Sequence, residues 1–562
     1  MQFNMRKQFS GSRRTFFWLL ILAFLAGFSI AKVEDISLGT VREAGRLLGF
    51  SFSQAELENM MPSVRMHRQA GEAISDARLD NSVTSALEFD PLPRGFELPV
   101  QKGDIPWELP EDVFLPENPD ELAYYSIPEL AALLKNREIT SEELTLFFLN
   151  RLEEHGETLE GVVTITRDRA LQQARKADRE IAAGNYRGPL HGIPYGVKDL
   201  LAVEGYPTTW GAMPFKDQVI DYTASVVEQL DEAGAVLTAK LTMGALAMGD
   251  VWFGGKTRNP WNLEDGSSGS SAGSAAAVSA GLLPFALGTE TLGSIVSPST
   301  RCGVTGLRPT YGRVSRDGAM ALSWSMDKIG PLARSAEECA MVLEVINGPD
   351  GKDRSLVDAG FNYDPDLKVT DLRVGYIAAF FEQEYPGVEA DNQVLTDLSN
   401  MGVELKEVEW GFQLPVNALR IILYAESAAA FDELTVSGRD SLLVNQAMNA
   451  WPNLFRGARF IPAVDYINAN RVRSLLVEEV NELMKDYDVV VTPSYGGNQL
   501  LVTNLTGHPA IAAPNGFTEG GSPLSITFLG QLYGEGKVVS LVKAWQEYSG
   551  HHAKRPPLFD PL

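Results

Sequence analysis

The sequence predicts an α/β protein with a large central mixed β-sheet covered by helices on both faces, and with a helical N-terminal extension. Strand-like runs occur at 161–166, 195–203, 235–241 and 489–492, and helical stretches lie between many of them. Strands and helices mixed along the chain favour a sheet that is covered on both sides. Hydrophobic residues make up 44% of the 562 residues, which is enough for one large core.

The first 31 residues have the organisation of a signal peptide. Residues 1–14 contain four basic side chains and no acidic one, and the nearly apolar run 16–31 ends in the small-x-small pattern Ser29-Ile30-Ala31. The string 12–17 resembles a twin-arginine export signal. We therefore expect an exported protein, periplasmic or secreted. The alternative is membrane association through an uncleaved segment 16–31, although that run is short for a full span.

A helical extension and a proline-rich linker are expected next, over residues 32–121. Within 34–90, the stretches 41–48 and 54–79 repeat apolar residues at intervals of three and four, which predicts helices. Seven prolines then follow between 91 and 119, where they remove backbone donors and block helix formation.

The main domain is expected over 122–562. It opens with two helix-start signals: Ser126 with Glu129, and Thr140 with Glu143, have the spacing of capping boxes.

Composition excludes several classes of function. The net charge of −25 disfavours nucleic acid as a partner, because phosphate binding needs a concentrated basic surface. Two cysteines, Cys302 and Cys339, cannot form a disulfide framework, and we expect both to be small buried hydrophobic residues. Six scattered histidines show no metal-ligand spacing, so no metal and no cofactor are expected.

Three segments contain residues that could carry chemistry. Lys198 follows the apolar strand Tyr195-Gly-Val, where burial would favour its neutral amine and make it a base. The segment 266–274 is rich in glycine and serine, and its serines could cap the helix that follows. Ser294 lies in a glycine-containing turn whose backbone N–H groups could form an oxyanion hole. Taken singly, these signals also fit a surface lysine and a capped loop that binds nothing.

The three segments together resemble the amidase-signature family. Further family motifs follow in order, as 258–262, 281–288, 302–309, 311–315 and 327–331, and Ser270 and Ser294 have the family's separation. The resemblance implies the family fold and a Ser–cis-Ser–Lys triad, with Lys198 as base, Ser270 as the bridging serine after a cis peptide bond, and Ser294 as nucleophile.

The chemistry implied by the resemblance is hydrolysis of a linear carboxamide through an acyl-enzyme on Ser294. Lys198 takes a proton from Ser270, which takes one from Ser294. The oxyanion is assigned to backbone N–H groups at Thr291, Leu292, Gly293 and Ser294. Ser271 and Asp199 are expected to support the triad. An activity that rises toward alkaline pH is expected, because Lys198 must be neutral.

The sequence departs from the common family pattern around the nucleophile. Leu292 replaces the first glycine of a Gly-Gly-Ser tract, and Val296 stands where arginine is common. The tract 243–256 is also divergent, and we expect Met243 and Trp252 to line the substrate pocket.

Several alternatives remain open at this point. The chain could be a catalytically silent binding or scaffold protein on the amidase fold, or an esterase, because the same acyl-enzyme route cleaves esters. A third alternative is the component of the tRNA-dependent amidotransferases that has the same signature and works with partners in the cytoplasm. The N-terminal export signal of this chain argues against that alternative. The expected partner is otherwise a small-molecule or peptide amide.

Overall fold

A computed structural model describes residues 36–76, 79–83 and 85–560. The proposed leader and anchor (1–31) lie outside the described residues. The chain forms two compact units that divide between Leu79 and Asp80. Residues 80–121, which the sequence assigned to an extension and linker, therefore belong to the larger unit.

The described residues of the first unit form two helices, α2 (Leu38–Leu47) and α3 (Gln54–Ser75), as the apolar spacing predicted. Ser53 and Glu56 form a capping box that begins α3. Val41, Leu57 and Met61 are buried between the helices, which gives this unit a small core of its own.

The proline-rich arm of the second unit contains one short 3₁₀ helix, η1 (Pro119–Tyr124), among its described residues. The rest is extended and attached by hydrogen bonds to the main body. Gly360 N–H donates to the Pro99 carbonyl at 2.6 Å, and Lys102 N–H donates to the Asn362 side chain at 2.9 Å.

The second unit is built on a mixed sheet, which has eleven strands among the described residues. The strand order is β1-β3-β2-β8-β10-β9-β14-β15-β13-β11-β12. The strands β2, β3 and β8 are parallel, as are β11, β12 and β13, and the other pairs are antiparallel. The bounds are β1 (Val162–Ile165), β2 (Pro194–Lys198), β3 (Val236–Leu241), β8 (Phe285–Glu290), β9 (Thr305–Arg308), β10 (Lys328–Ala333), β11 (Val374–Tyr376), β12 (Leu405–Glu407), β13 (Val489–Pro493), β14 (Ala510–Phe517) and β15 (Pro523–Gly530).

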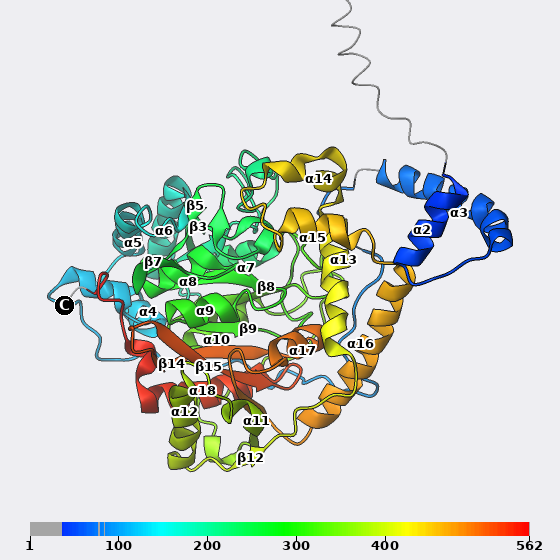
Figure 1. Ribbon diagram of the computed structural model, residues 1–562. Helices are drawn as coiled ribbons and strands as arrows, with labels where there is room; N and C mark the ends of the chain where they lie inside the picture. The colour runs from blue at the N-terminus through cyan, green and yellow to red at the C-terminus, as the bar shows by residue number, and fades with distance from the viewer. Residues whose placement is uncertain (1–35, 77–78, 84, 561–562) are drawn as a thin grey trace, which may run out of the picture. The chain divides into compact units, whose positions relative to one another are not determined.

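Helices cover both faces of this sheet, which confirms the predicted fold class (Figure 1). On one face α8 packs against α9, and on the other α10 packs against α18. Alternation along β8 explains the two cores, because Ala286 joins the α8 side while Phe285 and Leu287 join the α10 side. The helices are α4 (Ile127–Asn136), α5 (Ser141–His155), α6 (Arg167–Ala182), α7 (Ser225–Glu232), α8 (Ala272–Ser279), α9 (Val296–Cys302), α10 (Ala336–Ile346), α11 (Ala378–Phe381), α12 (Val388–Asn400), α13 (Ile421–Ala430), α14 (Asp432–Ser437), α15 (Trp451–Ala458), α16 (Ala463–Met484), α17 (Gln499–Thr506) and α18 (Glu535–Ser549).

The predicted helix starts are confirmed, since capping boxes at Ser126 and Thr140 begin α4 and α5. The strand predicted over 195–203 ends earlier, because the chain turns after Lys198. Both cysteines are buried, as expected, and both are free.

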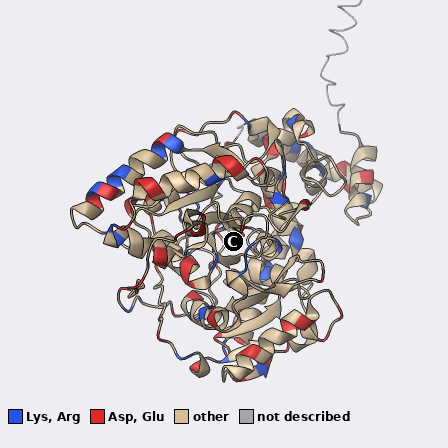
Figure 2. Ribbon diagram, turned by 90° about the vertical axis from the view of Figure 1, so that its left-hand side faces the viewer, with Lys and Arg blue, Asp and Glu red and all other residues tan. Residues whose placement is uncertain are grey.

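Figure 2 shows basic and acidic residues interspersed along the helices that face the viewer. Among the described residues, no helix is long and apolar enough to cross a membrane.

Candidate active site

Lys198 is the last residue of β2, and its side chain is fully buried. Its Nζ donates to Ser270 Oγ at 2.7 Å, to Thr289 Oγ1 at 2.8 Å and to Ser271 Oγ at 3.2 Å. The amine is therefore held by three hydroxyl groups, with no carboxylate within salt-bridge distance among the described residues. Such an environment disfavours the charged form of the amine and so lowers its pKa.

Burial lowers the pKa of Lys198 to about 7, against the opposing effects of Asp327 and Glu290. An amine with a pKa of about 7 is half neutral at pH 7 and largely neutral above it, so it can accept a proton. The structure thus gives a physical basis for the predicted role of Lys198 as a base.

The glycine- and serine-rich segment brings Ser270 and Ser271 to this lysine. The Gly269–Ser270 peptide bond is cis, as the family resemblance implied. Ser271 Oγ donates to the Thr289 carbonyl at 3.1 Å and accepts from Thr289 N–H at 3.1 Å. Ser271 can lie this close to β8 only because residue 288 is a glycine, since a Cβ at Gly288 would lie 2.7 Å from Ser271 Oγ.

The interpretation of these serines as helix caps is wrong. Ser271 stands at the N-cap position of α8, but its side chain accepts no hydrogen bond from the first turn of that helix. Its hydroxyl is already occupied by Thr289 and Lys198. Ser271 therefore ties the loop to β8 beside the lysine, which supports its predicted place next to the triad.

Ser294 lies in the short turn between β8 and α9 and is 8% exposed. Ser271 N–H donates to the Ser294 carbonyl at 3.2 Å, which joins the turn to the serine loop. Gly293 has a φ of 88°, which favours glycine, and a Cβ there would lie 3.0 Å from Leu500. Among the described residues no hydrogen bond joins the hydroxyls of Ser294 and Ser270. Hydrogen bonds between catalytic groups are often long without substrate and become shorter when substrate binds.

Backbone N–H groups of the same turn are available to an oxyanion. No hydrogen bond within the described residues uses the N–H groups of residues 291–294. Leu292 keeps a negative φ, and its side chain packs against the core, so replacing glycine here does not strain the turn. Val296 is buried at the start of α9.

The buried carboxylate of Glu290 holds the turn between β8 and α9 in place by hydrogen bonds. One carboxylate oxygen accepts from the N–H groups of Ile295 and Val296 at 2.9 and 3.0 Å. The other accepts from Arg308 at 2.7 Å and from Asn504 at 2.8 Å. Burial alone would raise the pKa of Glu290, but Arg308 and these hydrogen bonds together lower it to about 2. The start of α9 therefore packs on a buried ion pair between Glu290 and Arg308.

Removing that charge should destabilise the protein. We expect Glu290→Gln to lower the free energy of unfolding by about 3–5 kcal/mol, because Arg308 would remain buried without its counter-ion. The folded-state pKa is below the usual value, so the wild type should lose this stabilisation as pH falls from about 4.5 toward 2. Urea unfolding at several pH values measures both effects. The exposed Glu264→Gln is the matched control, and equal stability of the two variants would contradict the assigned role.

The second predicted supporting residue, Asp199, does not contact the triad. Its carboxylate pairs with Lys240 at 2.9 Å and accepts from Thr209 N–H at 2.9 Å. All three side chains are buried. Asp199 therefore connects the end of β2 to β3 and to the following loop, and its influence on Lys198 is through the backbone.

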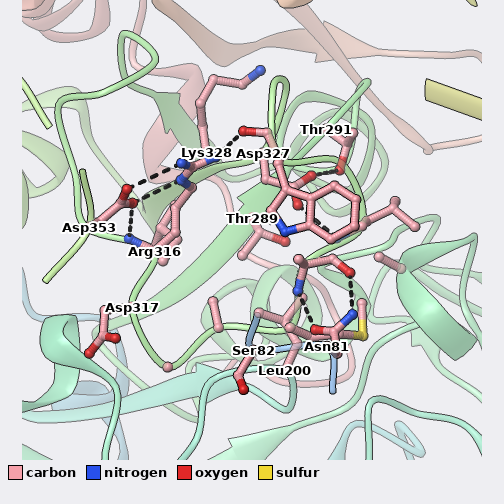
Figure 3. Close-up of a pocket in the computed structure, with 18 of the residues that line it drawn as sticks. Asn81, Ser82, Leu200, Thr289, Thr291, Arg316, Asp317, Asp327, Lys328 and Asp353 are labelled. Carbon is pink, nitrogen blue, oxygen red and sulfur yellow. Dashed lines mark hydrogen bonds and ion pairs between the residues drawn. The ribbon is translucent and has the colours of Figure 1, made fainter. Parts of the chain in front are cut away.

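A cavity of about 100 Å³ adjoins the site on the side of Thr289 and Thr291. Thr291 Oγ1 donates to Asp327 at 2.5 Å, and Asp327 also lines the cavity. Figure 3 shows Thr289 between Asp327 and Thr291 on one side and Asn81 and Leu200 on the other.

The two residues predicted to form the substrate pocket do not line this cavity. Met243 is fully buried in the main core, where its backbone approaches Gly211. Trp252 packs edge-on against Phe253 and faces a separate hollow beside α5. Their apolar side chains are used for packing, which apolar residue type alone does not distinguish from pocket lining.

Sequence reasoning missed Thr289, Glu290 and Arg308, although all three lie in or next to motifs that it singled out. A threonine and a salt bridge carry no distinctive spacing, so only the resemblance to the family could have drawn attention to them. The described residues contain no cluster of ligands that could hold a metal ion.

Comparison with known proteins places this geometry in a family. The family model described as Amidase matches residues 143–500. The glutamyl-tRNA(Gln) amidotransferase of Moorella thermoacetica has a component that is 34% identical over 495 residues, which are 78% of this chain and 99% of that protein. The native peptide amidase from Stenotrophomonas maltophilia superposes with a TM-score of 0.69 at 28% identity, covering 79% of this chain and 100% of that one. An amidase family protein from Bacillus anthracis gives a TM-score of 0.69 at 27% identity, covering 78% of this chain and 93% of that one. The chain belongs to the amidase family.

Proposed function

We propose that this protein hydrolyses a linear carboxamide to a carboxylate and ammonia or an amine, through an acyl-enzyme on Ser294. The observation that carries the proposal is the 2.7 Å hydrogen bond from the buried Lys198 to Ser270, beside the Ser294 turn. Membership of the amidase family supports amide chemistry in general, and the linear carboxamide is our more specific proposal.

Acylation starts with proton transfer along the three residues. Neutral Lys198 accepts a proton from Ser270, and Ser270 accepts one from Ser294, whose Oγ forms a bond to the amide carbon. N–H groups of residues 291–294 hold the oxyanion, and each such donor contributes about 3–4 kcal/mol to the transition state. The C–N bond then breaks as the proton passes through Ser270 to the leaving nitrogen.

Deacylation uses the same proton relay, with water as the nucleophile and Ser294 as the leaving group. A water gives a proton to the relay and its oxygen bonds to the acyl carbon. The bond to Ser294 Oγ breaks and Ser294 recovers its proton. The sum is one amide and one water converted to one carboxylic acid and one amine, and the enzyme returns unchanged.

The test is a library of peptide, aryl, fatty and small aliphatic amides, with glutamine and matched esters included. Wild-type protein and Ser294→Ala are incubated with each compound, and products are identified by mass spectrometry. We expect Ser294-dependent loss of one amide class. Hydrolysis of esters alone would favour an esterase, and no turnover of any compound would favour a silent scaffold.

The pH dependence follows from the lowered pKa of Lys198. We expect kcat/KM to increase about tenfold per pH unit below 7 and to level off above it, because only the neutral amine accepts a proton. This inflection lies well below that of an ordinary lysine, near 10.4. Initial rates between pH 5 and 9 measure it, and a flat profile would contradict lysine as the base.

We also propose that the chain is exported, periplasmic or secreted, on the pattern of its first 31 residues. Expression with its own leader and N-terminal sequencing of the exported protein test this. A mature terminus near residue 32 would support cleavage, an intact membrane-bound chain would favour an anchor, and recovery only from the cytoplasm would overturn export.

A further inference from the structure

We propose that Asp250 is a positioning residue for the reaction. It holds Ser268 in the backbone conformation from which Ser270, two positions later, reaches Lys198. This inference rests on the proposed function through its proton relay, and it does not depend on which amide is cleaved. It also gives a role to the divergent tract 243–256, which the sequence analysis assigned to the substrate pocket.

Ser268 has a backbone conformation that serine rarely adopts. Its φ is 60°, in the left-handed region that favours glycine because a Cβ is crowded there. A residue other than glycine keeps such a conformation only where the surrounding structure holds it. Only Gly269 separates Ser268 from Ser270. The orientation of Ser270 therefore depends on the contacts that hold Ser268.

Asp250 holds Ser268 from outside the serine-rich loop. Its Oδ2 accepts from Ser268 N–H at 3.0 Å, whereas the Ser268 carbonyl accepts from the adjacent Ser267 Oγ at 2.9 Å. Hydrogen bonds to an ionised acceptor are stronger than those between neutral groups. Within the described part of the chain, Asp250 takes part in no ion pair, while the nearby Arg258 pairs with Glu160. No basic side chain therefore competes with the Ser268 N–H for this carboxylate.

The tract that contains Asp250 is itself fixed by the main body. The buried Trp451 donates from Nε1 to the Leu246 carbonyl at 2.9 Å, and Leu246 N–H donates to the Trp210 carbonyl at 2.9 Å. Thr257 N–H donates to the backbone carbonyl of Asp250 at 3.1 Å. The place of the carboxylate is thus set by segments outside the serine-rich loop, as a group that positions another residue requires.

Backbone packing carries this constraint to Ser270. A Cβ at Gly269 would overlap the Gly249 carbonyl oxygen, so the two segments touch backbone against backbone. Ser270 follows directly, and its Oγ accepts from Lys198 Nζ at 2.7 Å. Misplacing a reacting group by about 1 Å can cost about 10²-fold in rate. Releasing Ser268 should therefore slow proton transfer through the relay.

The first test compares Asp250→Ala with the wild type on the best amide of the library. We expect kcat to decrease about 10- to 100-fold and KM to change less than about twofold, because the relay is misplaced while substrate binding is kept. Asp250→Asn keeps an oxygen that can accept from Ser268 N–H, and it should lose only about threefold. A loss that lies in KM alone would overturn the inference.

A double-mutant cycle distinguishes the hold on Ser268 from a general structural role. Glycine adopts a positive φ without the crowding of a Cβ, so Asp250→Ala should cost less than about threefold when Ser268→Gly is also present. An equal cost in both backgrounds would overturn the inference. Thermal unfolding shows which variants fold. If Asp250→Ala does not fold, Asp250→Asn is used in the same cycle, and its threefold loss should disappear in the Ser268→Gly background.

Labelling by an alkyl fluorophosphonate provides a readout that needs no amide. The Ser294 oxygen bonds to phosphorus, fluoride leaves, and the proton passes through Ser270 to Lys198. Mass spectrometry of the labelled peptide gives the second-order rate constant. We expect Asp250→Ala to lower this constant by about 10- to 100-fold, and the additional Ser268→Gly to restore most of it.

The outcomes separate this inference from the proposed function. Asp364→Ala is the matched control and should label at the wild-type rate, because the exposed Asp364 also accepts one backbone N–H, from Asp366 at 3.0 Å. Labelling of wild-type Ser294 with an unchanged rate in folded Asp250→Ala would overturn the inference alone. Labelling that depends on Asp250, without hydrolysis of any amide, would support the inference and overturn the proposed function. Absence of labelling in the wild type would overturn both.

Discussion

Replacing Ser294 with alanine is expected to reduce kcat by roughly five to six orders of magnitude and to leave the fold intact. The side chain is 8% exposed in the turn before α9, and its hydroxyl makes no hydrogen bond to another of the described residues. Losing a nucleophile removes the whole covalent route, and the remaining activity comes from binding and the oxyanion donors alone. Steady-state rates on the best amide of the library measure this loss.

Trapping of the intermediate separates the role of Ser294 from a merely structural one. With hydroxylamine present, the wild type should form the hydroxamate of the acyl group, and rapid quenching should show a protein mass increased by that acyl group. Ser294→Ala should show neither. Ser274→Ala is the matched control, because Ser274 lies on the neighbouring helix α8 and, within the described part of the chain, its hydroxyl binds only the Leu287 carbonyl, at 2.9 Å. Full activity of Ser294→Ala would show that another group attacks the amide.

The sequence was most informative where a motif and a local pattern coincide. Lys198, Ser270 and Ser294 come from three separated segments, and the structure brings the first two to 2.7 Å and the third into the adjoining turn. The capping boxes at Ser126 and Thr140 were readable because each involves residues only three positions apart. Local spacing predicts local geometry well.

Contacts between distant segments were not readable in the same way. Asn81 reaches Ala321 across 240 positions, and nothing in the composition of the arm singles out this asparagine. Glu290 meets Asn504 across 214 positions and Arg308 across 18. Such pairs depend on the order of strands in the sheet, which strand-like runs alone do not specify.

Side-chain roles inside a motif were also ambiguous. A serine before a helix normally indicates a cap, yet Ser271 binds β8 and Lys198 instead. Met243 and Trp252 show the same problem for apolar residues, because burial in a core and lining of a pocket use the same residue types. In each case competing partners, which only the fold supplies, decide the role.

Replacing Lys198 is the second change with a large expected effect. Lys198→Met keeps the length and the apolar stem but removes the base, and we expect kcat/KM to decrease by about 10³- to 10⁵-fold, in the range of general-base removal combined with loss of the relay. The small remaining activity should no longer show the inflection near pH 7. Lys198→Arg should not restore activity, because a guanidinium keeps its proton throughout this range.

Stability measurements distinguish a lost base from a damaged fold. In the wild type the folded-state pKa of Lys198 is about 7, below the ordinary value near 10.4 of an exposed lysine. Between these values the unfolded chain binds more protons than the folded one, so the stability of the wild type should increase with pH across this window. Lys198→Met should lack that part of the increase and should be at least as stable as the wild type at pH 7. Lys256→Arg, at a half-buried site on the β5 hairpin strand (Gly255–Lys256), is the control for lysine replacement. An active Lys198→Arg variant, or a pH profile unchanged in Lys198→Met, would show that the proton is taken by another group.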